Sequence, residues 1–348
     1  MTDQHPDVAA RLARLAPDQR AAATAPPGPI LCVAPAGSGK TTTLVARVAW
    51  LVDGGEVPEQ ICAVTFNKRA AEELAGRLDA ALAPLGLAAG SVRVRTFHAL
   101  GREILRGGGV DVSLLLDRAT LLAELEGDRL TPARLRRLDD AFSRLKLDLG
   151  IRPEVLAIEV ASEQAAGRPA GSVVRAFLRY EAALAARQAL DFDDLVRRAL
   201  LILEERPDLL ERWRTACAHL LVDEVQDLDR TQLRLALMLA EPRNQVFLVG
   251  DDDQTIYAWR LADVRRVLGL AGDLPELRRV DLITNYRCPP AVVTRAVRLI
   301  EHNRERFAKG IRASPVAEGQ LWLHPDPGDE VARARRLLAE WPAPRGEG

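Results

Sequence analysis

The chain has 348 residues, 48% hydrophobic and 28% charged, with a formal net charge of −1; this is the composition of a folded protein with a large core and excludes a disordered chain. The near-neutral charge does not exclude nucleic-acid binding, because a basic groove can lie on a neutral protein, but the apolar runs fall short of the roughly 18 residues that span a membrane. The polar N-terminal segment is unlike a signal peptide and the four cysteines are dispersed without CxxC spacing, so we expect a cytoplasmic protein with no membrane partner, disulfide scaffold or zinc site.

Five short apolar runs predict buried parallel strands. Each is followed by a turn or by a helical pattern, and such alternation of strands and helices is typical of an α/β sheet with crossover connections. The predicted strands cover residues 30–34, 61–66, 92–96, 219–223 and 245–250.

Between residues 107 and 190 the pattern changes to Ala, Leu and Arg residues at helical spacing, with amphipathic helices predicted at 118–126 and 132–145. We interpret this stretch as a helical insertion that interrupts the sheet, with the glycines at 107–109 as a hinge. Further along the chain, the predicted elements are a strand at 279–284, a helix from 290 to about 306, a strand at 321–324 and a helix at 330–340.

The sequence APAGSGKT, from Ala34 to Thr41, follows a predicted strand and opens a helical run, which is the context of a phosphate-binding P-loop. Gly37 and Gly39 let backbone N–H groups curl around phosphate oxygens, and Lys40 can reach the β and γ phosphates of ATP. The Thr41 hydroxyl can bind Mg²⁺. The alternative is a glycine-rich turn that arises by chance, but because strand, loop and helix are all predicted in this order, phosphate binding is the preferred interpretation.

A second apolar strand ends in two adjacent acids, Asp223 and Glu224, within the sequence LLVDEVQD at 220–227. By itself such a pair is usually a solvated strand end. Together with a P-loop it indicates an ATPase site, in which Asp223 would hold Mg²⁺ and Glu224 would orient and deprotonate the attacking water.

These segments and several others resemble those of one family. The DEVQD sequence at 223–227 resembles the DExQD box of superfamily 1A helicases, the UvrD/Rep/PcrA group. The other matches, in the order of the family, are LAPDQ at 15–19, TFNK at 65–68, RTFH at 95–98, DFDDL at 191–195, GDDDQTIYAWR at 250–260 and NYR at 285–287.

The resemblance implies that ATP and Mg²⁺ are the cofactors. Gln19 would hydrogen-bond the adenine and Tyr286 would stack on it, whereas Arg287 would reach the γ-phosphate as an arginine finger. The residues implied in catalysis are Lys40, Glu224, Gln254 (as a sensor of the γ-phosphate) and Arg287. The residues implied in nucleotide binding are Gln19, Ala36, Gly37, Ser38, Gly39, Lys40, Thr41, Thr42 (where many relatives carry a basic residue) and Tyr286, and the implied metal ligands are Thr41 and Asp223.

The resemblance also implies a path for single-stranded DNA. Phe66 and Trp259 would stack on bases, an interaction that tolerates any sequence and contributes roughly 1–3 kcal/mol per base. Tyr257 and His98 would lie near the DNA, and Arg260 would link Trp259 to the nucleotide site. From the residues alone, the alternative for Phe66 is a place in the core, because it ends an apolar strand, and His98 could equally cap a helix or be buried.

The implied fold is α/β: a RecA-like P-loop NTPase parallel sheet with a helical insertion, followed by the start of a second RecA-like domain. The first domain would comprise residues 1–106 and 191–278, the insertion 107–190, and the second domain 279–348. About 60 residues follow Arg287, and two later motifs of the family, one with a second arginine finger, are not found. We therefore expect the chain to stop before its second motor domain is complete, and not to unwind duplex DNA alone.

The activity implied by the resemblance is ATP-driven translocation along single-stranded or tailed duplex DNA, usually 3′ to 5′, in repair or replication. One alternative is an ATP- and DNA-binding regulatory protein that does not unwind, or half of a split motor completed by another polypeptide. A second alternative is a P-loop ATPase acting on a partner other than DNA, against which the paired aromatic residues and the DNA-facing motifs count.

Overall fold

The computed structural model describes residues 4–149, 151–165, 171–255, 262–319 and 329–340. The strands are β1 (Ile30–Val33), β2 (Ile61–Thr65), β3 (Arg93–Thr96), β4 (His219–Val222), β5 (Val246–Gly250), β6 (Arg278–Asp281), β7 (Thr284–Asn285) and β8 (Arg312–Ala313). The helices are α1 (Pro6–Ala13), α2 (Pro17–Ala23), α3 (Lys40–Asp53), α4 (Lys68–Leu82), α5 (Phe97–Gly107), α6 (Arg118–Glu126), α7 (Pro132–Leu147), α8 (Pro153–Ala165), α9 (Ser172–Ala186), α10 (Phe192–Glu205), α11 (Pro207–Ala216), α12 (Arg230–Ala240), α13 (Val264–Leu268), α14 (Leu270–Asp273), α15 (Pro290–Ile300) and α16 (Glu330–Glu340).

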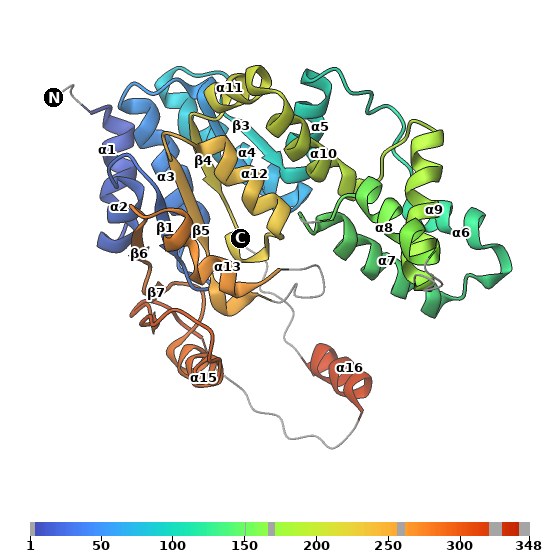
Figure 1. Cartoon of the computed structure of the whole chain (residues 1–348). Helices are drawn as coiled ribbons and strands as arrows, with labels where there is room; N and C mark the ends of the chain where they lie inside the picture. The colour runs from blue at the N-terminus through green and yellow to red at the C-terminus, as the bar shows by residue number, and fades with distance from the viewer. Residues whose placement is uncertain (1–3, 150, 166–170, 256–261, 320–328, 341–348) are drawn as a thin grey trace.

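Six parallel strands form the main sheet in the order β3-β2-β4-β5-β1-β6, with helices packed on both of its faces (Figure 1). In β1, Leu31 and Val33 join the apolar cluster of α5, α10 and α12, whereas Ile30 and Cys32 join the cluster of α1 to α4 on the other face. Burial on both faces explains why the four central strands, β2, β4, β5 and β1, are mainly apolar runs, whereas the edge strands β3 and β6 are only partly buried and carry arginines. The predicted α/β class with a parallel sheet is confirmed.

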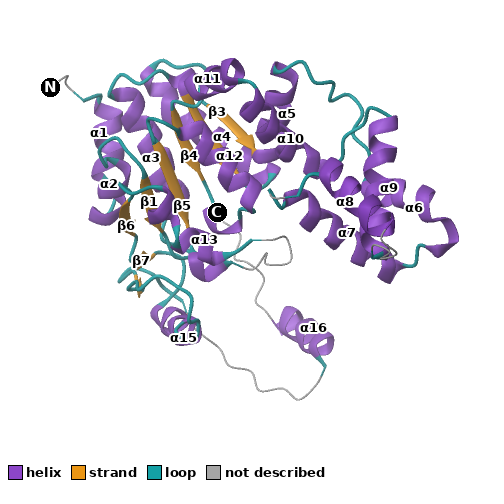
Figure 2. Cartoon of the chain, in the orientation of Figure 1, coloured by secondary structure: helices purple, strands orange, loops and turns teal. Residues whose placement is uncertain are grey.

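The insertion has a separate apolar core. Helices α6, α7 and α9 bury Leu121, Phe142, Phe177 and Tyr180 against one another, apart from the two clusters of the main sheet. Figure 2 shows this group of helices to one side of the strands. Helix α10 connects the two parts, because it packs extensively on α5 of the main unit and also contacts α7.

The region after residue 278 differs from the expected elements. The strand expected at 279–284 is divided: β6 pairs with β1 at the edge of the main sheet, and β7 pairs with β8 in a separate two-stranded sheet. By its pairing, this first segment belongs to the main sheet, not to a following domain. The helix expected to reach about residue 306 ends at Ile300, and the strand expected at 321–324 lies outside the described residues.

The strand order brings the loops that carry the sequence motifs to one edge of the sheet. The P-loop follows β1, Asp223 follows β4 and Asp251 follows β5, and the carboxyl ends of parallel strands share one edge. Among the described residues, no helix is both long and apolar enough to cross a bilayer.

Candidate active site

The P-loop connects β1 to α3 and depends on two glycines in the left-handed region. Gly37 has a φ of 71° and Gly39 a φ of 85°, and a Cβ at Gly39 would lie 2.5 Å from Gln19 Nε2. The left-handed conformation therefore disfavours any other residue at Gly39, and a side chain there would also displace the Gln19 amide. Because Gly39 is the N-cap, α3 begins at Lys40 with its first backbone N–H groups available to an anion.

Lys40 and Glu224 face each other across the site. Lys40 Nζ lies 2.7 Å from Glu224 Oε2, and Gln226 Nε2 donates a hydrogen bond to the same oxygen at 2.9 Å. Glu224 has a φ of 53°, a conformation that costs a non-glycine residue roughly 1–3 kcal/mol and that clusters at functional sites. The structure thus brings together the phosphate-binding and water-activating residues expected from the sequence.

Asp223, the expected metal ligand, is buried beside this pair. Burial and the adjacent Glu224 carboxylate raise the pKa of Asp223 to about 6. Thr41 lies in the first turn of α3, and the Lys40–Glu224 contact joins its loop to that of Asp223. A carboxylate and a hydroxyl are the oxygen ligands that Mg²⁺ prefers, and a divalent cation would relieve the unfavourable negative charge at Asp223. The residues therefore fit the ion.

Asp251, directly after β5, joins the P-loop to the rest of the site. Its Oδ2 accepts hydrogen bonds from the backbone N–H of Ala36 at 3.1 Å and from Gln254 Nε2 at 2.5 Å. Its own N–H donates to Gln226 Oε1 at 3.0 Å. A Cβ at Gly250 would lie 2.2 Å from that amide oxygen and 2.9 Å from Val225 Cγ1, so a side chain there would displace both residues. These bonds fix Gln254, the expected γ-phosphate sensor, next to the P-loop.

Gln19 lies against the P-loop with both ends of its amide engaged. Gln19 Nε2 donates to the Ser38 carbonyl at 2.8 Å, and Gln19 Oε1 accepts from the Ala16 N–H at 3.1 Å. The neighbouring Asp18 accepts the backbone N–H of Ile283 at 2.9 Å. The start of α2 therefore holds both the P-loop and the chain that follows β6.

The segment after β6 covers the P-loop from the other side. Asn285 Nδ2 donates to the Ala36 carbonyl at 2.7 Å, and the Tyr286 N–H donates to the Gly37 carbonyl at 2.8 Å. A Cβ at Gly37 would come within 2.7 Å of the Cβ of Arg287. Tyr286 and Arg287 are thus next to the P-loop, and both side chains are exposed.

An arginine that the sequence analysis missed reaches the P-loop helix. Arg77 Nη2, on α4, donates to Thr42 Oγ1 at 3.0 Å. Thr42 is exposed and occupies the position at which many relatives are expected to carry a basic residue. The contact with Arg77 supplies a cation at this position from another helix. No local pattern could have indicated this pair, because the two residues are 35 positions apart.

The expected DNA-facing residues are only partly described. Phe66, after β2, and His98, in the first turn of α5, are both half-buried. The cap of α5 is Thr96, whose Oγ1 accepts the Ala99 N–H at 3.2 Å, so His98 does not serve as the cap. Tyr257, Trp259 and Arg260 lie outside the described residues.

His98 stacks on Phe192, another residue to which the sequence analysis gave no role. The ring centroids are 3.8 Å apart with an interplanar angle of 21°, and Phe192 is 53% exposed. Phe192 is the first residue of α10, whose N-cap is Asp191, and the two rings form an aromatic surface contributed by α5 and α10. The signal in the sequence was a phenylalanine between the acids of the DFDDL segment.

Comparison with known proteins gives one consistent result. The family model of the UvrD/REP helicase N-terminal domain matches residues 15–275. The chain is 32% identical over 316 residues to ATP-dependent DNA helicase PcrA of Staphylococcus epidermidis, covering 87% of this chain and 41% of that protein. It is 31% identical over 296 residues to ATP-dependent DNA helicase PcrA of Staphylococcus aureus, covering 82% of this chain and 39% of that protein. The chain therefore spans about two fifths of the length of these relatives.

Proposed function

The chain belongs to the UvrD/REP helicase family, and we propose that it provides the ATP-binding part of a DNA-dependent ATPase that moves along single-stranded DNA. The observation that carries the proposal is the contact at 2.7 Å between Lys40 and Glu224, which joins the P-loop to the DExQD box. Both relatives are named ATP-dependent DNA helicases, which supports the same activity here.

In the proposed mechanism, the phosphates of ATP compete with Glu224 for the Lys40 ammonium. Once Lys40 binds the β and γ phosphates, Glu224 is free to take the proton of the attacking water. Mg²⁺, held by Thr41 and Asp223, would neutralise charge on the phosphates when bound. Gln254 would contact the γ-phosphate. These roles are proposals that the Lys40–Glu224 pair and the bonds of Asp251 support.

The remaining nucleotide contacts come from both sides of the P-loop. Gln19 and Tyr286 would bind the adenine, with Tyr286 supplying its exposed ring for stacking. Arg287 would reach the γ-phosphate from the segment after β6. We propose that Arg77 acts at the Thr42 position, where it places a guanidinium beside the first turn of α3.

DNA would run over the carboxyl edge of the sheet. The His98–Phe192 stack offers an aromatic face to a base, and Phe66 follows the neighbouring strand β2. We propose that Tyr257, Trp259 and Arg260 complete this path and that movement is 3′ to 5′. The proposed units are residues 1–106 with 191–281, the insertion 107–190, and a following unit that begins after β6, because β6 pairs with β1.

The test is ATP hydrolysis by the purified chain with and without single-stranded oligodeoxythymidine, with Lys40→Ala as the control. Turnover stimulated by DNA and lost in Lys40→Ala supports the proposal. Binding of ATP and DNA without turnover would favour the regulatory alternative. Turnover that DNA does not change would indicate a P-loop ATPase with a different partner.

A further inference from the structure

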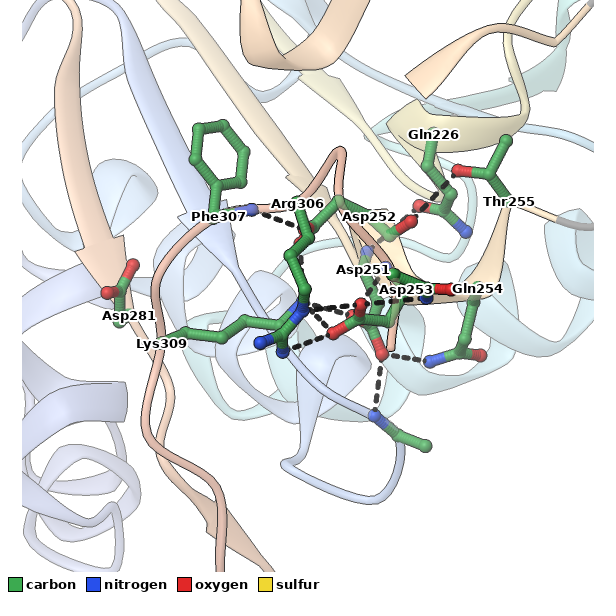
Figure 3. A network of polar contacts seen from close by, with 12 residues as sticks. Gln226, Asp251, Asp252, Asp253, Gln254, Thr255, Asp281, Arg306, Phe307 and Lys309 are labelled. Atoms are coloured by element: carbon green, nitrogen blue, oxygen red, sulfur yellow. Dashed lines mark hydrogen bonds and ion pairs between the residues drawn. The ribbon is translucent and has the colours of Figure 1, made fainter. Parts of the chain in front are cut away.

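Three consecutive carboxylates after β5 surround one lysine from a distant part of the chain. Lys309 Nζ lies 2.7 Å from Asp251 Oδ1 and 2.9 Å from Asp253 Oδ2, and it also pairs with Asp252. The lysine side chain is only 1% exposed. Figure 3 shows Lys309 reaching the acidic residues from the segment that follows α15.

The same segment makes two further contacts with this acidic turn. Arg306 forms a two-point ion pair with Asp253, at 2.9 Å from Nε and 2.8 Å from Nη2. The backbone N–H of Phe307 donates to Asp252 Oδ2 at 2.8 Å (Figure 3). Residues 306–309 thus contact all three carboxylates, and the two cations offset most of their charge.

The three carboxylates of this cluster repel one another and need nearby cations. One carboxylate oxygen from each of the three aspartates lies within 4.8 Å of the other two, a grouping close enough to hold a metal ion, and the ammonium of Lys309 pairs with all three residues. Burial disfavours the charged lysine, but the carboxylates, Asp251 foremost, outweigh it and raise the pKa of Lys309. Loss of the lysine would leave three closely spaced acids. Among the residues that the structure describes, Arg306 would be the cation that still pairs with them.

Asp251 connects the cluster to the nucleotide site. One of its oxygens, Oδ1, binds Lys309, while the other, Oδ2, accepts the N–H of Ala36 in the P-loop and the side chain of Gln254. A single carboxylate therefore transmits the position of Lys309 to two groups that the proposed function assigns to ATP. The uncompensated charge of the acidic turn would also repel the triphosphate directly.

We infer that Lys309 is a positioning residue for ATP: it fixes Asp251 against the P-loop and neutralises the acidic turn beside the polyphosphate. The inference rests on the proposed function and extends it by naming a residue, outside the sequence motifs, that links the segment after α15 to the ATP site. Its charge, more than its packing, determines the affinity for nucleotide.

The experiment measures binding of a fluorescent ATP derivative in the presence of Mg²⁺. Lys309→Met should weaken binding on the order of tenfold, from the loss of one nearby charge at intermediate dielectric. Lys309→Arg, which keeps the charge, should recover much of the affinity. Adding Asp252→Asn to Lys309→Met should also recover it, because removal of one carboxylate restores the charge balance while the amide oxygen can still accept the Phe307 N–H.

Two controls separate charge from folding. Arg304→Met removes one positive charge from an exposed position of the same segment and should change binding little. Asp252→Asn alone, which removes no cation, should tighten ATP binding by a few-fold and affect AMP less, because AMP carries less charge. The comparison of Asp252→Asn with wild type tests the inference even if Lys309→Met fails to fold.

The outcomes are distinct. Absence of nucleotide binding by the wild-type chain would overturn the proposed function, and with it this inference. Wild-type binding that Lys309→Met leaves unchanged, or a loss in Lys309→Met that Asp252→Asn does not repair, would overturn the inference alone. Equal affinity of wild type and Asp252→Asn for ATP would do the same.

Discussion

Glu224 and Lys40 neutralise each other at 2.7 Å, so the residue proposed to activate water also competes with phosphate for the P-loop cation. Glu224→Gln removes the competing charge and the base while keeping the shape. We predict that this variant binds ATP at least as tightly as wild type and hydrolyses it roughly 10²–10⁴-fold more slowly. Binding of a fluorescent ATP derivative and steady-state phosphate release measure the two effects. Loss of ATP binding in Glu224→Gln would contradict this division of roles.

Asp227 should make the stability of the folded protein depend on pH. Burial and the Glu224 carboxylate raise the pKa of Asp227 to about 7, and within the described residues its buried Oδ1 has no hydrogen-bond partner. Because the folded pKa lies above the unfolded value of 3.8, the folded state keeps the proton between these values. Stability contributed by Asp227 is therefore lost as pH rises from about 4 to 7.

From this sign we predict that Asp227→Asn, which stays neutral, unfolds at higher denaturant concentration than wild type at pH 8. Each pKa unit corresponds to about 1.4 kcal/mol, so the free energy of unfolding of Asp227→Asn should exceed that of wild type by an amount that grows by a few kcal/mol between pH 5 and 7. Above pH 7 this difference should stay constant. Urea unfolding at a series of pH values measures it. A difference that is the same at every pH would show that Asp227 is not the titrating group.

The exposed ring of Phe192 makes the DNA proposal testable at one residue. Its side chain stacks on His98 and is 53% exposed, so truncation removes a base-stacking surface with little loss of core packing. We predict that Phe192→Ala weakens binding of single-stranded DNA by roughly 1–3 kcal/mol, with little sequence preference. Fluorescence anisotropy with labelled oligonucleotides is the measurement, and unchanged ATP binding is the control. Equal DNA affinity in the variant would remove Phe192 from the proposed path.

At the scale of elements, one buried lysine joins the insertion to α10. Lys146, on α7, is fully buried and lies 2.9 Å from each of three acids: Glu181 on α9, and Asp191 and Asp194 at the start of α10. Asp191 is also the N-cap of α10, and its Oδ2 accepts the Tyr180 hydroxyl at 2.9 Å. The network therefore fixes the end of α10 that carries Phe192.

Lys146→Met should destabilise the fold by about 3–5 kcal/mol, because it leaves buried carboxylates without their shared cation. Lys68→Met is the matched control: its lysine is 88% exposed, pairs with Glu72 one helical turn away, and should contribute about 0–1 kcal/mol. Urea unfolding measures both, and hydrogen exchange at the first turn of α10 shows whether the loss begins there. Similar small effects in the two variants would contradict a structural role for the buried network.

The elements that were predicted well are those whose pattern is local. The first five strands of the main sheet were located to within one residue at each end, and four of them are mainly apolar runs, whereas the strand expected at 279–284 was divided into β6 and β7. The helix expected at 290–306 ends at Ile300 because Arg306, Phe307 and Lys309 bind the acidic turn 251–253. Tertiary contacts override helical spacing there, and the sequence near residue 300 does not encode the partner.

The same distinction applies to the candidate site when the whole molecule is considered. The P-loop and the DExQD box could be predicted because each lies in a short segment with its own turn chemistry. Arg77 and Lys309 could not, because they approach Thr42 and Asp251 from positions 35 and 58 residues away. Only the folded chain brings these cations to the loops of the sheet.

At the scale of the whole molecule, the P-loop is held by segments from across the chain, since Gln19, Asp251 and Asn285 all bind its backbone. Binding of a nucleotide to this loop should therefore increase the stability of the entire main sheet. Ligand that binds only the folded state adds RT ln(1 + [L]/Kd), about 2.7 kcal/mol at 100 times Kd. We predict that saturating Mg²⁺ and a slowly hydrolysed ATP analogue raise the thermal midpoint by several degrees.

The shift should rise with the logarithm of nucleotide concentration above Kd, as this linkage requires, and differential scanning fluorimetry measures it. Lys40→Ala should lose most of the shift, because it removes the cation proposed to bind the phosphates while leaving the loop glycines in place. Mg²⁺ alone should have little effect, since the proposed ligands Asp223 and Thr41 would supply only part of a coordination shell that phosphate oxygens would complete. An equal shift in Lys40→Ala would show that nucleotide binds elsewhere, and the proposed ATP site would then be wrong.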